Sequence, residues 1–176
     1  MTDSFAHHLR LDQIRDGQRI ELSADEGECR AIAERLGLQW LDRLEAHATL
    51  SRNGELVRAS GRLGAALAQS CVVTGEPVSA HVDEPFDLMF MPEPQSSGRD
   101  EEIELGQADC DTVFYDGGTI DLGGAIADTL ALGLDPYPRS AGAEAALREA
   151  GVMTEDQAGP FAALAELRNK LGRSDS

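Results

Sequence analysis

Residues 57–73 read VRASGRLGAALAQSCVV, and residues 78–90 read VSAHVDEPFDLMF. Alternation of apolar and polar residues with a period of two is typical of a β-strand that buries one face. The two stretches are separated by Thr74-Gly75-Glu76-Pro77, which has the composition of a turn, and they therefore predict two neighbouring antiparallel strands. Their predicted buried residues are Val57, Ala59, Leu63, Ala65, Leu67, Cys71 and Val73 in the first stretch, and Val78, Ala80, Val82, Phe86, Leu88 and Phe90 in the second.

The first of these strands is unusually long. At roughly 3.3 Å per residue it would span about 56 Å, which exceeds the usual length of a flat strand. We therefore expect a bulge or bend at Gly61 or Gly64. A short helix at 63–70 is the alternative, because alanine and leucine dominate there. In the second strand, Pro85 indicates an edge position, since proline cannot donate to a neighbouring strand.

Upstream, Phe5, His7, Leu9 and Leu11 alternate with polar residues and predict a first strand. Ser23 and Glu26 match a capping box for a helix at about 24–36, which Gly37 would end. A second strand follows at 40–50, with Trp40, Leu44, Ala46, Ala48 and Leu50 on one face. Asn53-Gly54 predicts a type I′ hairpin turn.

Downstream, residues 112–115 predict a last strand, and 116–118 predict a turn. Apolar residues on nearly every side indicate a buried helix from Ile120 to Leu134, capped by Thr119 or Asp121. Asp135-Pro136-Tyr137-Pro138 should end this helix. A weak helix at 141–150 and an amphipathic C-terminal helix at about 160–171 follow. The fold class predicted is α+β, a single domain of residues 1–176 with an antiparallel sheet or meander partly covered by helices and a mobile acidic loop at about 92–111.

The charge balance restricts the kinds of partner. The chain has 15 basic and 32 acidic side chains, a net charge of −17, and residues 93–135 contain a single basic residue, Arg99. Such a surface repels phosphates and attracts cationic proteins. Arg52, Arg58 and Arg62 would share one face of a strand, but three arginines give only weak, salt-sensitive binding. We therefore expect little direct nucleic-acid binding and a basic protein partner.

The sequence also lacks the signals of a membrane helix, a secreted protein and a disulfide framework, and we use this to predict its cellular location and redox state. No apolar stretch reaches the roughly 20 residues of a membrane helix, and the N-terminus lacks the features of a signal peptide. The three cysteines, Cys29, Cys71 and Cys110, are widely spaced and indicate neither a disulfide framework nor a zinc knuckle. The prediction is a reduced, cytoplasmic protein that does not contact membranes.

No catalytic, metal or cofactor site is predicted. Asp109, Asp111 and Asp116 superficially resemble a calcium loop, but Val113 occupies a ligand position. Gly117–Gly124 lacks the spacing and the lysine of a phosphate-binding loop. Cys71 and His81 should point to opposite faces, whereas a nucleophile and its base must lie within hydrogen-bond reach.

Two blocks of sequence do stand out. The first is QSCVVTGEPV at 69–78, followed by Phe86 and Phe90; the second is DGGTIDLG at 116–123, followed by Leu130, Leu132, Leu134 and DPYPR at 135–139. In this order they resemble the YceD family of large ribosomal RNA subunit accumulation proteins, and Pro160–Leu164 resembles its alphaproteobacterial branch. The resemblance implies a non-enzymatic role in accumulation or processing of large-subunit ribosomal RNA. The paired cysteines of some relatives are absent, so no zinc site is carried over.

The two blocks also supply the candidate functional residues. We expect Cys71, Glu76 and Pro77 to form a structural corner, with the Glu76 carboxylate accepting backbone N–H groups, and we assign structural roles to Asp121, Leu122, Pro136 and Pro138. Tyr137 and Arg139 are residue types enriched at binding hot spots; with Asp135 they form the predicted partner-binding segment. The partner would be a large-subunit ribosomal protein or an assembly intermediate. The alternatives are a cysteine- or metal-dependent enzyme and an acidic chaperone or nucleic-acid mimic.

Overall fold

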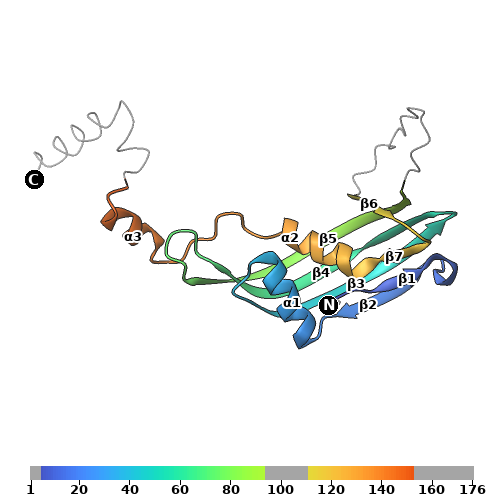
Figure 1. Cartoon of the computed structure of the whole chain (residues 1–176), viewed down its shortest axis with the longest axis horizontal. Coiled ribbons are helices and arrows are strands. Elements are labelled where there is room, and N and C mark those ends of the chain that lie inside the picture. Colours follow the sequence, from blue (N-terminus) through green and yellow to red (C-terminus); the bar gives the residue numbers. More distant parts are fainter. Residues whose placement is uncertain (1–4, 94–110, 153–176) are drawn as a thin grey trace, which may run out of the picture.

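The computed structural model describes residues 5–93 and 111–152 (Figure 1). The predicted acidic loop at 92–111, apart from its ends, and the predicted helix at 160–171 lie outside these residues. The elements, in chain order, are β1 (His8–Arg10), the 3-10 helix η1 (Leu11–Gln13), β2 (Gln18–Ser23), α1 (Glu26–Leu36), β3 (Trp40–Asn53), β4 (Leu56–Ser70), β5 (Pro77–Pro92), β6 (Asp111–Tyr115), β7 (Thr119–Asp121), α2 (Leu122–Leu132) and α3 (Ala143–Glu149).

A sheet of five strands in the order β2-β3-β4-β5-β6 forms the body of the protein. The first four strands are antiparallel neighbours, and the alternation predicted three of them, β3, β4 and β5. β6 departs from the expected meander because it runs parallel to β5. A parallel pair needs a long connection, and the chain between Pro92 and Asp111 has the length for one. The fold is α+β, and that prediction is confirmed.

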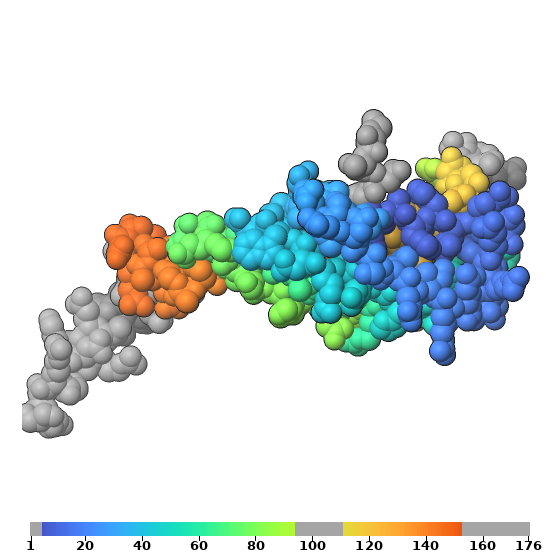
Figure 2. Space-filling model, turned by 90° about the horizontal axis from the view of Figure 1, so that it is seen from below, coloured from blue at the N-terminus to red at the C-terminus, as the bar shows by residue number. Residues whose placement is uncertain are grey.

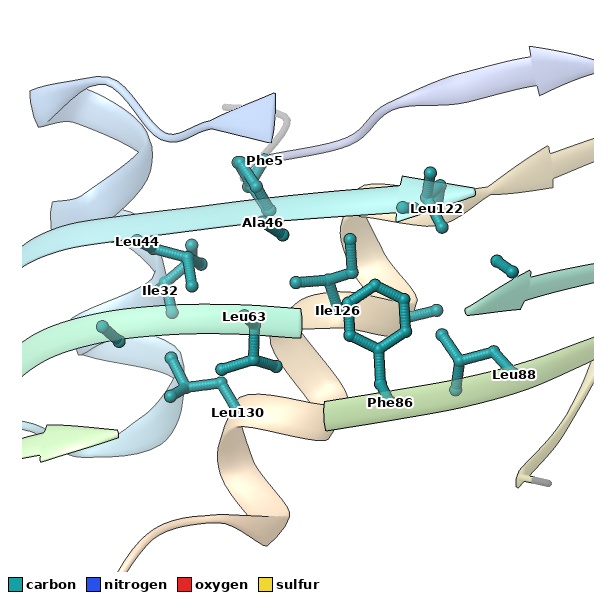
Figure 3. Packing of buried hydrophobic residues seen from close by; sticks show 14 of the residues in the cluster. Phe5, Ile32, Leu44, Ala46, Leu63, Phe86, Leu88, Leu122, Ile126 and Leu130 are labelled. Atoms are coloured by element: carbon teal, nitrogen blue, oxygen red, sulfur yellow. The ribbon is translucent and has the colours of Figure 1, made fainter. Parts of the chain in front are cut away.

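Both long helices lie on one face of the sheet, α1 over β3 and α2 over β4 and β5. Figure 3 shows Ile126 and Leu130 of α2 packed against Leu63 and Phe86 of these strands. Ile126 and Leu130 are fully buried, and each such side chain stabilises the fold by roughly 1.5–3 kcal/mol. The ion pair between Arg35 of α1 and Asp128 of α2, at 3.1 Å, is largely exposed and contributes at most about 1 kcal/mol. Burial therefore holds α2 in place.

The central strand β4 is continuous, so a bulge at Gly61 or Gly64 and the alternative helix at 63–70 are both wrong. Its pairing with β3 and with β5 runs through Gly61 and Gly64 without a register shift. Gly61 is needed for a different reason: a Cβ atom there would lie 1.9 Å from the carbonyl oxygen of His47 on β3. A Cβ atom at Gly64 would meet nothing within 4 Å. The backbone of β3 can thus approach β4 closely at this point only because residue 61 is a glycine.

The N-terminal region departs most from prediction. The first strand is shorter than expected, and β1 pairs with β7 outside the main sheet. The prediction missed β2, which extends to Ser23 and pairs there with Glu45. Ser23 is therefore unable to cap α1. The capping box is instead formed by Asp25 and Glu28, whose side chains each accept from the other's backbone N–H at 2.8 Å.

Two details of the β3–β4 region also differ. A register shift between Leu41 and Arg43 buries Leu41 and leaves Trp40 40% exposed, although Trp40 was predicted to be on the buried face. The hairpin loop is Gly54-Glu55, because Asn53 still pairs with Leu56. Only Gly54 has positive φ, which is the pattern of a type II′ turn and not of the predicted type I′ turn.

The second half follows the prediction except at β7. The strand at 112–115 is not the last, because Thr119–Asp121 pairs with β1, and the helix predicted from Ile120 to Leu134 spans Leu122–Leu132. Asp121 caps α2 by accepting from Gly124 N at 3.0 Å, and the helix is followed by Gly133. β6, the turn at 116–118 and the short helix α3 lie at the expected positions. Pro85 lies where β5 has a described strand on one side only, since β6 pairs only with Leu88–Pro92.

Gly61 and Gly64 provide a matched test of the packing of β4. We expect Gly61→Ala to lower the free energy of unfolding by about 1–3 kcal/mol, because the new methyl group can be accommodated only if the backbone of β3 moves. Gly64→Ala should be neutral or stabilising, since alanine is favoured over glycine within a strand. Urea denaturation of both variants measures this difference, and equal stabilities would contradict the close approach at Gly61.

Candidate functional site

The turn between β4 and β5 is tied to the segment that follows α2. Cys71, at the end of β4, is buried, and its sulfur accepts from the backbone N–H groups of Thr74 at 3.4 Å and Ser140 at 3.2 Å. One Glu76 carboxylate oxygen accepts from the hydroxyl groups of Thr74 at 3.1 Å and Ser140 at 2.9 Å. We refer to Cys71, Thr74, Glu76 and Ser140 as the Cys71 corner. Four side chains thereby join two parts of the chain that are distant in sequence.

The hydrogen bonds of the Glu76 side chain differ from the prediction. The Glu76 side chain accepts from two hydroxyl groups, and the backbone N–H groups are bound by the Cys71 sulfur instead. The backbone oxygen of Glu76 accepts from Cys71 N at 2.7 Å, which closes the turn before β5 begins at Pro77. Sequence reasoning missed Ser140, because no local pattern links a serine to a turn 64 residues upstream.

The thiol of Cys71 is chemically distinct from that of Cys29. Hydrogen bonding from Thr74, together with that from Ser140, lowers the pKa of Cys71 to about 6, although burial acts in the opposite direction. Burial raises the pKa of Cys29. The Cys71 sulfur thus has the character of a thiolate that accepts hydrogen bonds. Its described partners are main-chain and hydroxyl groups, and His81 lies on β5, where it is paired with Ala66 in mid-strand.

The Cys71 corner fixes the position of the segment Asp135–Arg139, which we call the DPYPR loop. Gln69 Nε2 donates to the carbonyl oxygen of Asp135 at 2.8 Å, and Val72 N donates to that of Pro138 at 2.9 Å. Figure 2 shows the chain after α2, in orange, against the β4–β5 turn, in green, at one end of the molecule. The loop is therefore attached to the sheet at both of its ends.

The side chains of the DPYPR loop differ in their exposure to solvent. Pro138 is buried, whereas Asp135, Pro136, Tyr137 and Arg139 are exposed. Tyr137 is 72% exposed, and its backbone N–H donates to Asp135 Oδ1 at 2.9 Å, which stiffens the turn. Val72, hydrogen-bonded to the loop, is a further exposed apolar side chain. An aromatic ring held on a fixed backbone loses little conformational freedom on binding, which favours its use as a contact residue.

Asp121 and Leu122 lie at the other end of α2, so the structure does not bring all the predicted site residues together. Asp121 Oδ1 accepts from His7 N as well as from Gly124 N, each at 3.0 Å. Leu122 is fully buried. Both residues attach the N-terminal segment to the first turn of α2, beside Gly123, where a Cβ atom would lie 1.8 Å from the carbonyl oxygen of Phe5.

The predicted patch of three arginines is not formed. Arg58 is paired with Asp87, and Arg62 is paired with Asp83 at 2.8 Å, both on the face opposite the helices. Hydrogen bonding from Arg58 lowers the pKa of Asp87. Arg52 was expected on the same face, but in the β3–β4 register it is opposite buried Val57 and reaches the carbonyl oxygens of Leu11 and Gly54. The positive charges therefore have partners within the protein.

The open face of the sheet, opposite α1 and α2, carries a hollow of about 730 Å³. Charged residues of both signs line it, including Glu21, Glu45, Arg43 and Arg62. No group of three potential metal-ligating side chains is found in residues 5–93 and 111–152. No helix within those residues is both long and apolar enough to cross a membrane.

Comparison with known families is decisive for residues 59–168, which match the model of the family described as "Large ribosomal RNA subunit accumulation protein YceD". The chain belongs to the YceD family. Neither the curated proteins nor the solved structures contain a significant match. The matched region includes most of β4, the Cys71 corner, α2 and the DPYPR loop. The family description connects this YceD-family protein with accumulation of large-subunit ribosomal RNA.

The role of the Cys71 sulfur in this YceD-family protein predicts a pH dependence of stability. Its folded-state pKa of about 6 lies below the ordinary value of 9.0. The folded state therefore holds fewer protons between these values, and the stabilisation should be complete near pH 9 and lost as the pH falls through 6.

We expect Cys71→Ala to be less stable than the wild type, by a margin that widens as the pH is raised from about 6 to about 9. Cys29→Ala, at a thiol whose pKa is raised, is the control and should show no such widening over this range. Urea denaturation at several pH values measures the margin. A margin for Cys71→Ala that does not change with pH would contradict a thiolate acceptor.

Proposed function

We propose that this protein supports the accumulation or processing of large-subunit ribosomal RNA by binding a basic protein of the assembling large subunit in the cytoplasm. The observation that carries the proposal is the DPYPR loop, which presents Tyr137 at 72% exposure while hydrogen bonds hold the loop at both ends. Tyrosine and arginine are enriched at binding hot spots. The loop thus combines a suitable contact residue with a fixed position.

Charge supports a basic protein over RNA as the direct partner. With a net charge of −17, the surface favours encounter with cationic molecules and repels phosphates. RNA binding would need a basic face, yet Arg58 and Arg62 are already paired with carboxylates. Release of these arginines would leave Asp87 and Asp83 without their partners, which opposes their use for phosphate binding.

A non-enzymatic role is the corresponding proposal for Cys71. The sulfur is buried beneath Thr74 and Ser140, and its described donors are main-chain N–H and hydroxyl groups of these two residues. A nucleophile would need a base within reach and access for a substrate. In our proposal the low pKa of Cys71 reflects the hydrogen bonds that its sulfur accepts, and these hydrogen bonds hold the corner that positions the DPYPR loop.

The test is a pull-down from cell lysate with the wild type, Tyr137→Ala and Phe114→Ala. Phe114 is the control because it is a similarly exposed aromatic residue, 55% exposed, on β6. We expect the wild type and Phe114→Ala to capture a large-subunit ribosomal protein. Tyr137→Ala should weaken capture by about 2 kcal/mol, the loss typical of a hot-spot residue, without lowering the melting temperature.

Nuclease treatment and salt distinguish the kinds of partner. Capture should survive nuclease and decrease at higher salt, because the attraction is between the acidic chain and a basic protein. Tight binding to protein-free ribosomal RNA at physiological salt would contradict the proposal. Equal losses for Tyr137→Ala and Phe114→Ala would show that the DPYPR loop is not the contact surface.

A further inference from the structure

β5 has a long edge with no neighbouring strand. It pairs with β4 from Pro77 to Phe90, but β6 pairs only with Leu88–Pro92 on the other side. In the described part of the chain, residues Pro77–Asp87 therefore have a strand on one side only. The described loops and turns form no main-chain hydrogen bond with these residues either. Such an edge is a ready template for a strand from another molecule.

The direction of the main-chain groups along this edge follows from the two ends of β5. Just before the strand, the Glu76 carbonyl accepts from Cys71 on the β4 side. Just after it, Glu93 N donates to Tyr115 on the β6 side, at 3.0 Å. Main-chain groups alternate in direction along a strand, and the β4–β5 register is continuous. Even-numbered residues therefore face β4, and odd-numbered residues face the free edge.

The positions of the prolines agree with this alternation. Pro77 and Pro85 both have odd numbers, so each lacks an N–H group on the side where no partner strand lies. Between them, Ser79, His81 and Asp83 direct both a donor and an acceptor to the free edge. These three residues could form the hydrogen bonds of an additional strand without any change in the pairing of β5 with β4.

The chain that leads from α2 into the DPYPR loop passes over β5. A Cβ atom on Gly133, two residues before the loop, would be 3.2 Å from Val82 and 3.3 Å from Glu84. Gln69, which donates to Asp135, is the register partner of Val78. The chain after α2 thus passes from Val82 and Glu84 of β5 to Gln69 of β4, across the face of the sheet that carries the helices.

The charges of β5 indicate the chemistry of the added strand. The strand contains no lysine or arginine. Of its acidic side chains, Asp83 and Asp87 are paired with Arg62 and Arg58 of β4, so Glu84 is the remaining one. A second copy of the chain carries the same net charge of −17, which opposes self-association. A segment rich in lysine and arginine is instead attracted to the acidic protein. The edge therefore favours a basic partner over self-association.

We propose that the Pro77–Asp87 edge of β5 receives an extended, lysine- and arginine-rich segment of the partner protein as an additional strand. Ser79, His81 and Asp83 supply the main-chain hydrogen bonds, and Tyr137 contacts the same segment from the DPYPR loop. The identity of the partner as a large-subunit protein rests on the proposed function, whereas the mode of binding rests on the geometry of β5.

The experiment uses short synthetic peptides that tile the basic proteins of the large ribosomal subunit. Binding is measured to the wild-type protein, His81→Pro and His81→Ala. His81→Pro removes an N–H group that faces the free edge, and His81→Ala removes the same side chain but keeps that group. We expect a lysine- and arginine-rich peptide to bind the wild type and His81→Ala similarly. Binding to His81→Pro should be about tenfold weaker, the effect of one lost main-chain hydrogen bond.

Amide hydrogen exchange of the wild-type protein gives a second readout that does not depend on the folding of His81→Pro. On peptide binding, exchange should slow at Ser79, His81 and Asp83 and change little at Val78, Ala80 and Val82, which already face β4. Protection without this alternation, or none along β5, would overturn the strand-addition proposal. Alternating protection that depends on protein concentration without peptide would overturn it in favour of a second copy.

The remaining outcomes separate this proposal from the proposed function. If whole large-subunit proteins are captured through Tyr137 but no peptide binds along β5, strand addition is wrong and the proposed function stands. If neither whole proteins nor peptides bind, both proposals are wrong.

Discussion

The rest of the structure depends on pairing of β4 with two strands along nearly its whole length. Every backbone group of this strand can then be satisfied within the sheet, and the side chains of one face, from Val57 to Leu67, are 0–3% exposed. That face must be covered by apolar surface, and α1 and α2 cover it. The uninterrupted pairing in turn requires Gly61, where the β3 backbone leaves no room for a side chain. The pairing of β4 with β3 and β5 therefore determines which face of the sheet the helices cover and which face stays open.

The function we propose depends on what happens where β4 ends. There the chain turns at the Cys71 corner, and the segment after α2 returns to be fixed against the turn by Cys71 and Glu76. The polar, titratable side chains of the corner therefore connect the β4–β5 turn to the segment after α2. The DPYPR loop and the start of β5 both follow from this corner, and in our proposal one extended partner contacts the loop and the free edge of β5.

Much of the fold could be predicted because β4, β5 and α2 bury apolar residues with a clear period. The alternation from Val57 to Phe90 specified two paired strands, and the hydrophobic run after Asp121 specified a buried helix. β2 was missed because its inward side chains, such as Ile20, are only partly buried and its outward positions carry charge. The role of Gly61 depends on the backbone of another strand, and that of Ser140 on a contact with Cys71, 69 residues upstream. Such long-range contacts leave no local pattern.

We propose that this YceD-family protein acts in assembly of the large ribosomal subunit through the DPYPR loop. The most direct measurement is a depletion strain, complemented with either the wild type or Tyr137→Ala and examined by sucrose gradients and blots of ribosomal RNA. We expect a deficit of large subunits and their RNA on depletion, restored by the wild type and not by an equally abundant Tyr137→Ala protein. Normal subunit profiles in the depleted strain would contradict it.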